Sequence, residues 1–235
     1  MRLRRKPWAR PELAACPFFV DEPAALRGRW AAAFSAPQPM ELELGCGKGT
    51  FIASLASRRR ECNYVAVDLK SEVLALAKRR AEEEYARAGA PVDNLLLLSQ
   101  DIERLPLIFQ PGADRFRRIY INFCNPWPKP RHHKHRLTHT RQLGMYRDFL
   151  IPRGELHFKT DDDALFEDTL GYLAQAGYEI LALHRDLHAA GLPGNIPTEH
   201  EELFAGRGVP IKYLIARPMD ADPPLAGKEG GPAAP

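Results

Sequence analysis

The sequence has few cysteines and no long hydrophobic run. None of its four cysteines belongs to a C-x-x-C pair, and Pro7, Arg10 and Pro11 interrupt the basic N-terminus before any apolar signal core begins. The longest aliphatic run, Leu95 to Leu98, is far too short to span a membrane. We therefore expect a protein of a reducing cytoplasm with no membrane partner.

Acidic residues are missing from one stretch of the chain. No Asp or Glu occurs between Arg115 and Arg147, a stretch that includes the segment CNPWPKPRHHKHRLTHTR. Its cations crowd beside Trp127, and they are Lys129, Arg131, Lys134, Arg136 and Arg141. The net charge of the whole chain is only +3, so the placement of charge is what points to a partner. A solvated basic loop is the plain alternative, but we favour a nucleic-acid phosphate site because the segment leaves the predicted sheet at its ligand end.

Histidines in the same segment raise the question of a metal site. They are His132, His133, His135 and His139. Their spacing is not a regular ligand spacing, and Lys134 and Arg136 lie among them and would repel a cation. We therefore predict no metal.

Glycines are concentrated in the stretch Met40 to Phe51, around which the chain is organised. An apolar strand is followed by Gly45, Gly47 and Gly49, which allow a tight turn and close approach of a ligand, and then by a helix start. Glu43 precedes the turn, where a carboxylate would repel a dinucleotide pyrophosphate but hold a cationic or hydroxyl-bearing ligand. The spacing matches neither G-x-G-x-x-G nor a Walker A loop. It favours S-adenosylmethionine over NAD, with an ordinary strand-to-helix turn as the alternative.

Length and apolar periodicity predict a single α/β domain with a largely parallel sheet. Strands are expected before Gly45 and at Asn63–Asp68, Asn94–Ser99, Phe116–Phe123, Gly154–Thr160, Tyr178–Leu183 and Ile211–Ala216. Helices are expected at Thr50–Ser57, Ser71–Ala88, Thr138–Leu150 and Ala164–Ala176. A long polar insert from His184 to Gly208 separates the last two strands, and loops of this length tend to be functional.

Carboxylates follow several of the predicted strands. Asp68 ends the second strand about 20 residues beyond the glycine turn, where an acidic residue binds ribose hydroxyls. Asp101 follows the third and is a candidate partner for the adenine amino group, although a turn Asp is the competing interpretation. Asp161 follows the fifth strand, where it and its neighbours serve either the substrate or the next helix as caps.

The two ends of the chain differ from its centre. Residues 1–39 are expected to form a basic arm and lead-in helix, the arm being either a solvated tail or a phosphate-binding segment that Trp8 anchors. Residues 40–217 would form the ligand-binding domain. Residues 218–235 are rich in Pro, Gly and Ala and are predicted to be disordered.

Taken together, the motifs RKPW, ELGCGKG, NFCNPWPKPRHHKHRLTH, HFKTD and GLPGNIPTEHEE resemble the bacterial tRNA (guanine-N7)-methyltransferases over most of residues 1–217. The resemblance implies a Rossmann-like class I methyltransferase fold with a seven-stranded, mostly parallel sheet, an antiparallel last strand and helices on both faces. It also implies methyl transfer from S-adenosylmethionine to a guanosine in the tRNA variable loop. By motif position, the cofactor-site residues are Glu43, Gly45, Gly47, Asp68, Asp101 and Asn125, and the substrate-binding residues are Lys129, Asp161, Thr198 and Glu201.

Two positions depart from the family pattern. Asp68 stands where the family often has Glu, and Asn125 replaces the proposed catalytic carboxylate of D-P-W-P-K. Guanine N7 carries a free lone pair and needs no general base, so we still expect activity. Asn125 is then the candidate catalytic residue, and it would position the guanine. Negative charge beside the methylated purine would then come from Glu201 or Asp161. The alternatives are a class I methyltransferase for another RNA or a small molecule, and an RNA-binding relative without catalysis. Either a monomer or a homodimer is compatible with the sequence.

Overall fold

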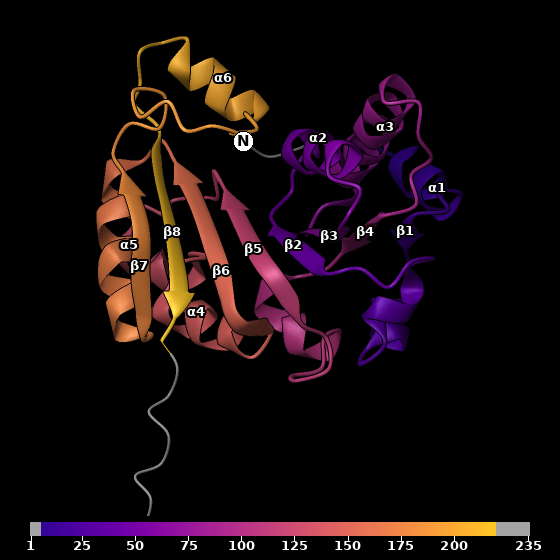
Figure 1. Ribbon diagram of the computed structural model, residues 1–235, viewed down its shortest axis with the longest axis horizontal. Helices are drawn as coiled ribbons and strands as arrows, with labels where there is room; N and C mark the ends of the chain where they lie inside the picture. Colours follow the sequence, from indigo (N-terminus) through magenta and orange to yellow (C-terminus); the bar gives the residue numbers. More distant parts are fainter. Residues whose placement is uncertain (1–5, 220–235) are drawn as a thin grey trace, which may run out of the picture.

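A computed structural model describes residues 6–219 of the protein, which are built around an eight-stranded sheet (Figure 1). The strand order is β1-β4-β3-β2-β5-β6-β8-β7. The strands are β1 (Phe19–Val20), β2 (Met40–Leu44), β3 (Asn63–Asp68), β4 (Leu95–Ser99), β5 (Phe116–Asn122), β6 (Leu150–Thr160), β7 (Tyr178–His184) and β8 (Lys212–Pro218). Strands β1 to β6 pair in parallel, and β8 runs antiparallel to both β6 and β7.

The predicted α/β architecture and its antiparallel last strand are confirmed, but the strand count of seven is wrong. The additional strand is β1, whose two residues pair with Leu97 and Leu98. Two residues are too few for an alternating pattern to be read in a sequence.

Helices lie on both faces of the sheet (Figure 1). One face carries α1 (Ala9–Ala14), α2 (Thr50–Arg58) and α3 (Ser71–Arg87), and the other carries α4 (Thr140–Arg147) and α5 (Asp163–Gln175). The helix predicted at Thr138–Leu150 is shorter than expected at both ends. His139 caps α4 by accepting from Arg141 N at 3.2 Å, and Leu150 already belongs to β6.

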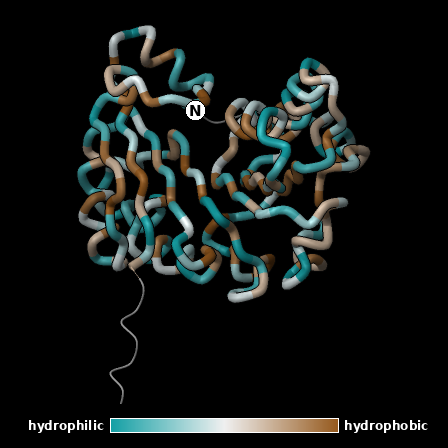
Figure 2. Tube along the Cα trace, in the orientation of Figure 1, coloured by the Kyte–Doolittle hydropathy of each residue, from teal (hydrophilic) through white to brown (hydrophobic). Residues whose placement is uncertain are grey.

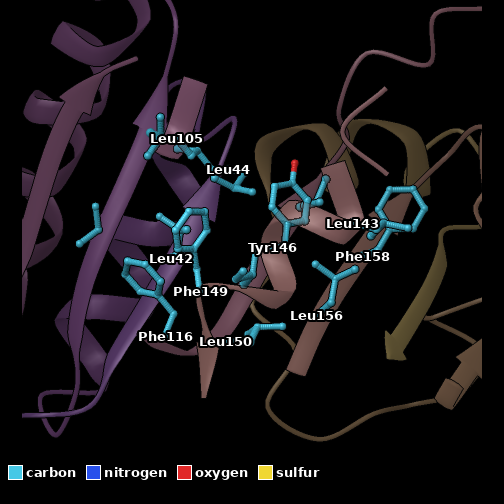
Figure 3. Packing of buried hydrophobic residues seen from close by; sticks show 14 of the residues in the cluster. Leu42, Leu44, Leu105, Phe116, Leu143, Tyr146, Phe149, Leu150, Leu156 and Phe158 are labelled. Atoms are coloured by element: carbon cyan, nitrogen blue, oxygen red, sulfur yellow. The ribbon is translucent and has the colours of Figure 1, made fainter. Parts of the chain in front are cut away.

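Side chains of the central strands alternate between two cores. In β3, Tyr64 and Ala66 pack with α2 and α3, whereas Val65 and Val67 belong to the opposite core, and all four are fully buried. Figure 3 shows the second core, in which Phe149 and Tyr146 pack against the sheet. Hydrophobic colouring accordingly runs along the strands in Figure 2.

Helix coverage is incomplete on the face that carries α1, α2 and α3. These helices lie over β2, β3 and β4, while β5, β6 and β8 are open toward the viewer in Figure 1. The insert between β7 and β8 extends over the upper ends of these strands and contains α6 (Glu199–Ala205), a helix that was not predicted.

The N-terminal arm is partly ordered against the domain. Ala9 and Leu13 of α1 are buried in the core beneath α3, and the Arg79 guanidinium lies 4.3 Å from the centroid of the Trp8 ring. Of the two alternatives for the arm, a solvated tail therefore does not describe the chain from Ala9 onward, because the helix buries apolar side chains. The tail predicted to be disordered begins at Pro218, but Pro218 is the last residue of β8. Residues 1–5 and the rest of that tail from residue 220 onward lie outside the described residues.

Candidate functional site

The predicted site residues meet at one edge of the sheet. Strands β2 to β6 are parallel, so their carboxyl ends all lie on the side that the insert covers (Figure 1). The glycine turn follows β2, Asp68 ends β3 and Asp101 follows β4, while Asn125 and Asp161 follow β5 and β6. A pocket of about 220 Å³ opens there between the glycine turn, the end of β5 and the start of α6.

The glycine turn shapes one wall of this pocket. The backbone N–H groups of Gly45 and Cys46 both donate to Val67 O, at 2.8 and 3.1 Å, which folds the turn onto β3. Gly47 has φ 53°, and a Cβ there would meet no atom within 4 Å, so the position faces open space. A Cβ on Gly49 would lie 2.7 Å from Ala77 Cβ, so this glycine permits the close approach of α2 and α3.

Glu43 is buried at the bottom of the pocket. Its Oε1 accepts from Asn122 Nδ2 at 2.9 Å, and its Oε2 has no hydrogen-bond partner among residues 6–219. Burial raises the pKa of Glu43 to about 7, with a smaller rise from the nearby Asp68 charge and with opposing effects of the Asn122 hydrogen bond and the Lys159 charge included. An unpaired buried carboxylate oxygen is costly, so a cationic or hydroxyl-bearing ligand would stabilise it.

Asp68 and Asp101 are close to the turn but partly engaged by the backbone. Asp68 accepts from Gly47 N and from Lys70 N, both at 3.0 Å, and burial raises its pKa. Asp101 accepts from Glu103 N at 2.9 Å and so caps a short 3-10 helix. This cap is the turn role that competed with an adenine contact, which stays a prediction.

Asn125 lies in a strained loop after β5. Phe123 and Trp127 have φ of 51° and 44°, values that non-glycine residues rarely adopt, and Asn125 Oδ1 accepts from Trp127 N at 3.1 Å. Beneath the loop, Arg136 donates to Pro126 O at 2.7 Å. Strain of this kind persists where the surroundings fix the backbone, and the buried guanidinium provides that fixation.

The sequence analysis placed Arg136 among the phosphate-binding cations, but the structure buries this side chain. Its side chain is only 2% exposed, and it binds Asp168 Oδ2 at 2.5 Å and His133 at 3.0 Å. It holds the Asn125 loop against α5 instead of facing solvent. Lys129, Arg131 and Lys134 are exposed and remain available to phosphates.

The four histidines make separate contacts. His135 lies 2.9 Å from Glu103 Oε1, His133 contacts Arg136, and His139 caps α4. The rings of His132 and His135 pack beside Trp127. Over residues 6–219 no group of three or more His, Cys, Asp or Glu side chains is arranged to hold a metal ion.

Two of the predicted substrate residues, Thr198 and Glu201, belong to the insert, and Thr198 lines the pocket. Thr198 caps α6 by accepting from Glu201 N at 2.9 Å, and it lines the pocket with His200. Asp161 lies 3.4 Å from His200 Nε2. Glu201 is fully buried and faces Lys159 and Asn195 at 3.0 and 2.7 Å, so its carboxylate is already paired. Lys129 is exposed at the end of the Asn125 loop.

Sequence reasoning missed Lys159 and Asn122 and gave Arg136 a different role, and all three position other site residues. Lys159 donates to Asn195, Ile196 O and Glu201, and thereby ties β6 to the insert. A signal for Lys159 was present, because a lysine inside a buried strand must find an acceptor. No comparable local signal marks Arg136, because its neighbours in the sequence form the basic segment that we predicted to bind phosphates.

Sequence comparison places these residues in a known context. Residues 37–214 match the family model described as "Putative methyltransferase". The chain is 53% identical over 220 residues to the tRNA (guanine-N(7)-)-methyltransferase of Clostridium perfringens (strain 13 / Type A), covering 93% of this chain and 100% of that protein. It is 52% identical over 217 residues to that of Ruminiclostridium cellulolyticum, with 92% of each chain covered.

Solved structures share the fold at low sequence identity. An antibiotic-related methyltransferase superposes with a TM-score of 0.55 at 16% identity, covering 76% of this chain and 86% of that one. The 16S rRNA methyltransferase KamB gives a TM-score of 0.54 at 16% identity, with 77% and 87% covered. These likenesses support a methyltransferase fold and nothing finer. No helix within residues 6–219 has the length and apolar character needed to cross a membrane.

Proposed function

The chain belongs to the tRNA (guanine-N(7)-)-methyltransferase family, and on that premise we propose that it methylates N7 of a guanosine in the tRNA variable loop, using S-adenosylmethionine. The observation that carries the proposal is the buried Glu43 carboxylate, whose Oε2 lacks a partner within the described residues beside an open glycine turn. We place this activity in residues 40–217, with the cofactor and the RNA meeting beneath the insert.

The pocket fits S-adenosylmethionine by its chemistry. Glu43 offers a carboxylate oxygen to the amino or hydroxyl groups of the cofactor, and the open space at Gly47 would admit the amino-acid part of the cofactor. Asp68 ends β3 where ribose hydroxyls would lie, and Asp101, two residues beyond the end of β4, would lie on the adenine side. When bound, the cofactor supplies an electrophilic methyl group.

The side chains of the site would then orient the guanine toward the methyl group. Guanine N7 presents a lone pair and carries no proton, so no general base is required. Asn125 would place the base by hydrogen bonding, while Asp161 at the adjacent strand end supplies negative charge near a purine that becomes cationic. Thr198 contributes a hydroxyl at the pocket wall. Glu201 would act through Thr198 and the insert, because its own carboxylate is buried and paired.

Exposed cations beside this edge are proposed to hold the tRNA backbone. Lys129, Arg131 and Lys134 project from the loop that carries Asn125, so phosphate contacts there would set the target base over the pocket. Arg10 of the arm is a further candidate, and the remaining arm arginines lie outside the described residues.

Transfer of labelled methyl groups to bulk tRNA, followed by nucleoside analysis, tests the proposal. We expect label in 7-methylguanosine. Label in another nucleoside would indicate a methyltransferase of different specificity, and tRNA binding without any label would indicate an RNA binder that has lost catalysis. Asp68→Ala should weaken cofactor binding while the fold is retained, and Lys70→Ala is the matched neighbour control.

A further inference from the structure

A second cavity lies next to the cofactor pocket, between the open face of the sheet, α2 and the insert. Its volume is about 310 Å³, and Phe51 and Asn122 line both it and the cofactor pocket. We call it the insert cavity. Its floor includes Arg118 of β5, His157 of β6 and Tyr213 of β8, and Asn195 belongs to its roof.

The charged side chains that line the insert cavity are all basic. Arg59, Arg118 and Lys159 line it, and no Asp or Glu does. Arg118 is paired with Glu155 at 3.0 Å and Lys159 with Glu201 at 3.0 Å, both behind the cavity surface. Arg59 has no hydrogen-bond or ion-pair acceptor for its guanidinium anywhere in residues 6–219, and its Nη2 atom lies beside Gly194 of the insert. One cation at this cavity is therefore free to bind an anionic group.

Aromatic rings form a continuous wall of the same cavity. Ring centroids are 5.1 Å apart between Phe51 and Tyr120, 5.1 Å between Tyr120 and His157, and 6.0 Å between His157 and Tyr213. The Tyr213 hydroxyl lies 2.7 Å from His157 Nδ1, which fixes both rings. Rings beside an arginine are the combination on which proteins stack nucleobases and hold phosphates.

We propose that the insert cavity is a nucleotide subsite, which takes one base against the Phe51–Tyr213 aromatic wall and one phosphate at Arg59. The volume of about 310 Å³ suits a single nucleotide. Two sources share this chemistry. One is the nucleotide next to the target guanosine in bound tRNA, which rests on the proposed function, and the other is a free nucleotide.

Two variants and one matched control separate these sources. Arg59→Gln removes the free cation, and Leu192→Trp fills the cavity from the insert. Arg58→Gln is the control. Arg58 precedes Arg59 and is the last residue of α2, and it is exposed and does not line the cavity. Thermal unfolding of each variant establishes that the fold is kept, and Arg59→Gln carries the test should Leu192→Trp not fold.

Methylation kinetics and direct binding are then measured side by side. If a tRNA nucleotide occupies the cavity, both variants raise KM for tRNA by about tenfold, as expected for a lost charge-assisted contact, with cofactor affinity unchanged. If a free nucleotide occupies it, calorimetry shows GMP or AMP binding that both variants weaken, with KM for tRNA unchanged. The calorimetric measurement needs no catalysis, so it tests whether the cavity binds a free nucleotide even if the protein methylates no tRNA. If neither variant raises KM for tRNA or weakens nucleotide binding, the proposal is overturned.

Discussion

Lys159 and Glu201 form a buried ion pair that joins the sheet to the insert. Lys159 Nζ lies 3.0 Å from Glu201 Oε2, and the two residues are 5% and 0% exposed. The same ammonium donates to Asn195 Oδ1 and Ile196 O, and its charge opposes the rise in the Glu43 pKa that burial causes. One side chain thus fixes the insert over the pocket and influences the carboxylate at its base.

Replacing Lys159 by Met should destabilise the protein. The substitution leaves Glu201 buried without its cation, and breaking a buried pair in this way costs about 3 kcal/mol or more. Chemical denaturation measures the free energy of unfolding. Lys48→Met is the matched control, because the Lys48–Glu199 pair is 56% and 60% exposed and exposed pairs contribute at most about 1 kcal/mol. Equal losses of unfolding free energy in the two variants would show that Lys159 does not hold the insert to the sheet.

Glu43 should make both stability and cofactor affinity depend on pH. Its pKa is raised from the ordinary 4.5 to about 7, so the folded state binds this proton more tightly than the unfolded state. The stability contributed is full below pH 4.5 and is lost as pH rises through 7. Ionisation over the same range exposes the ligand to a carboxylate, so affinity for S-adenosylmethionine should increase toward pH 8.

Glu43→Gln should remove both pH effects. The variant keeps the shape and the Asn122 contact but cannot ionise, so unfolding free energy and calorimetric affinity should vary less between pH 5 and 8 than in the wild type. We expect weaker cofactor binding at pH 8. Wild-type affinity that is flat across this range would exclude Glu43 as the titrating ligand group.

Asn125 should act by orientation and not by charge. Asn125→Asp shares its shape and acceptor geometry, so the target nucleoside should stay the same with a modest change in rate. Asn125→Ala should lose positioning, at a cost of about 1 to 3 kcal/mol, or roughly tenfold to a hundredfold in rate. Single-turnover methylation of tRNA compares the three proteins. A wild-type rate in Asn125→Ala would make the residue a bystander.

The exposed part of the basic segment should determine the salt dependence of tRNA binding. Replacing Lys129, Arg131 and Lys134 by Gln removes up to three phosphate contacts, and each should lower the slope of log affinity against log salt by about 1. Titrations at several salt concentrations measure this slope. An unchanged slope would mean that the phosphates are held elsewhere.

Arg136 provides the contrast within the same segment. Arg136→Gln should leave the salt slope unchanged but reduce unfolding free energy, because its guanidinium is buried against Pro126 O and Asp168. Its effect on rate should resemble that of Asn125→Ala, since the loop loses its support. A lower salt slope in Arg136→Gln would show that the side chain reaches RNA despite its burial.

Local patterns in the sequence were sufficient for much of the architecture. The predicted bounds of β3 agree with the structure at both ends, because a run of apolar β-branched residues closed by Asp68 has few alternatives. The glycine turn and Glu43 were also recognisable, since their chemistry depends on neighbours in the chain. Parallel strand order then predicted that Asp68, Asp101 and Asp161 would share one edge.

Only the tertiary structure decided what these side chains face. Arg136 and Arg131 look alike in sequence, yet one is buried beneath the Asn125 loop and the other is exposed, because burial depends on how α5 packs against that loop. Glu201 and Lys159 are 42 residues apart, and only the folding of the insert onto β6 brings them within 3.0 Å. Contacts between distant segments depend on the packing of whole elements, which no local pattern encodes.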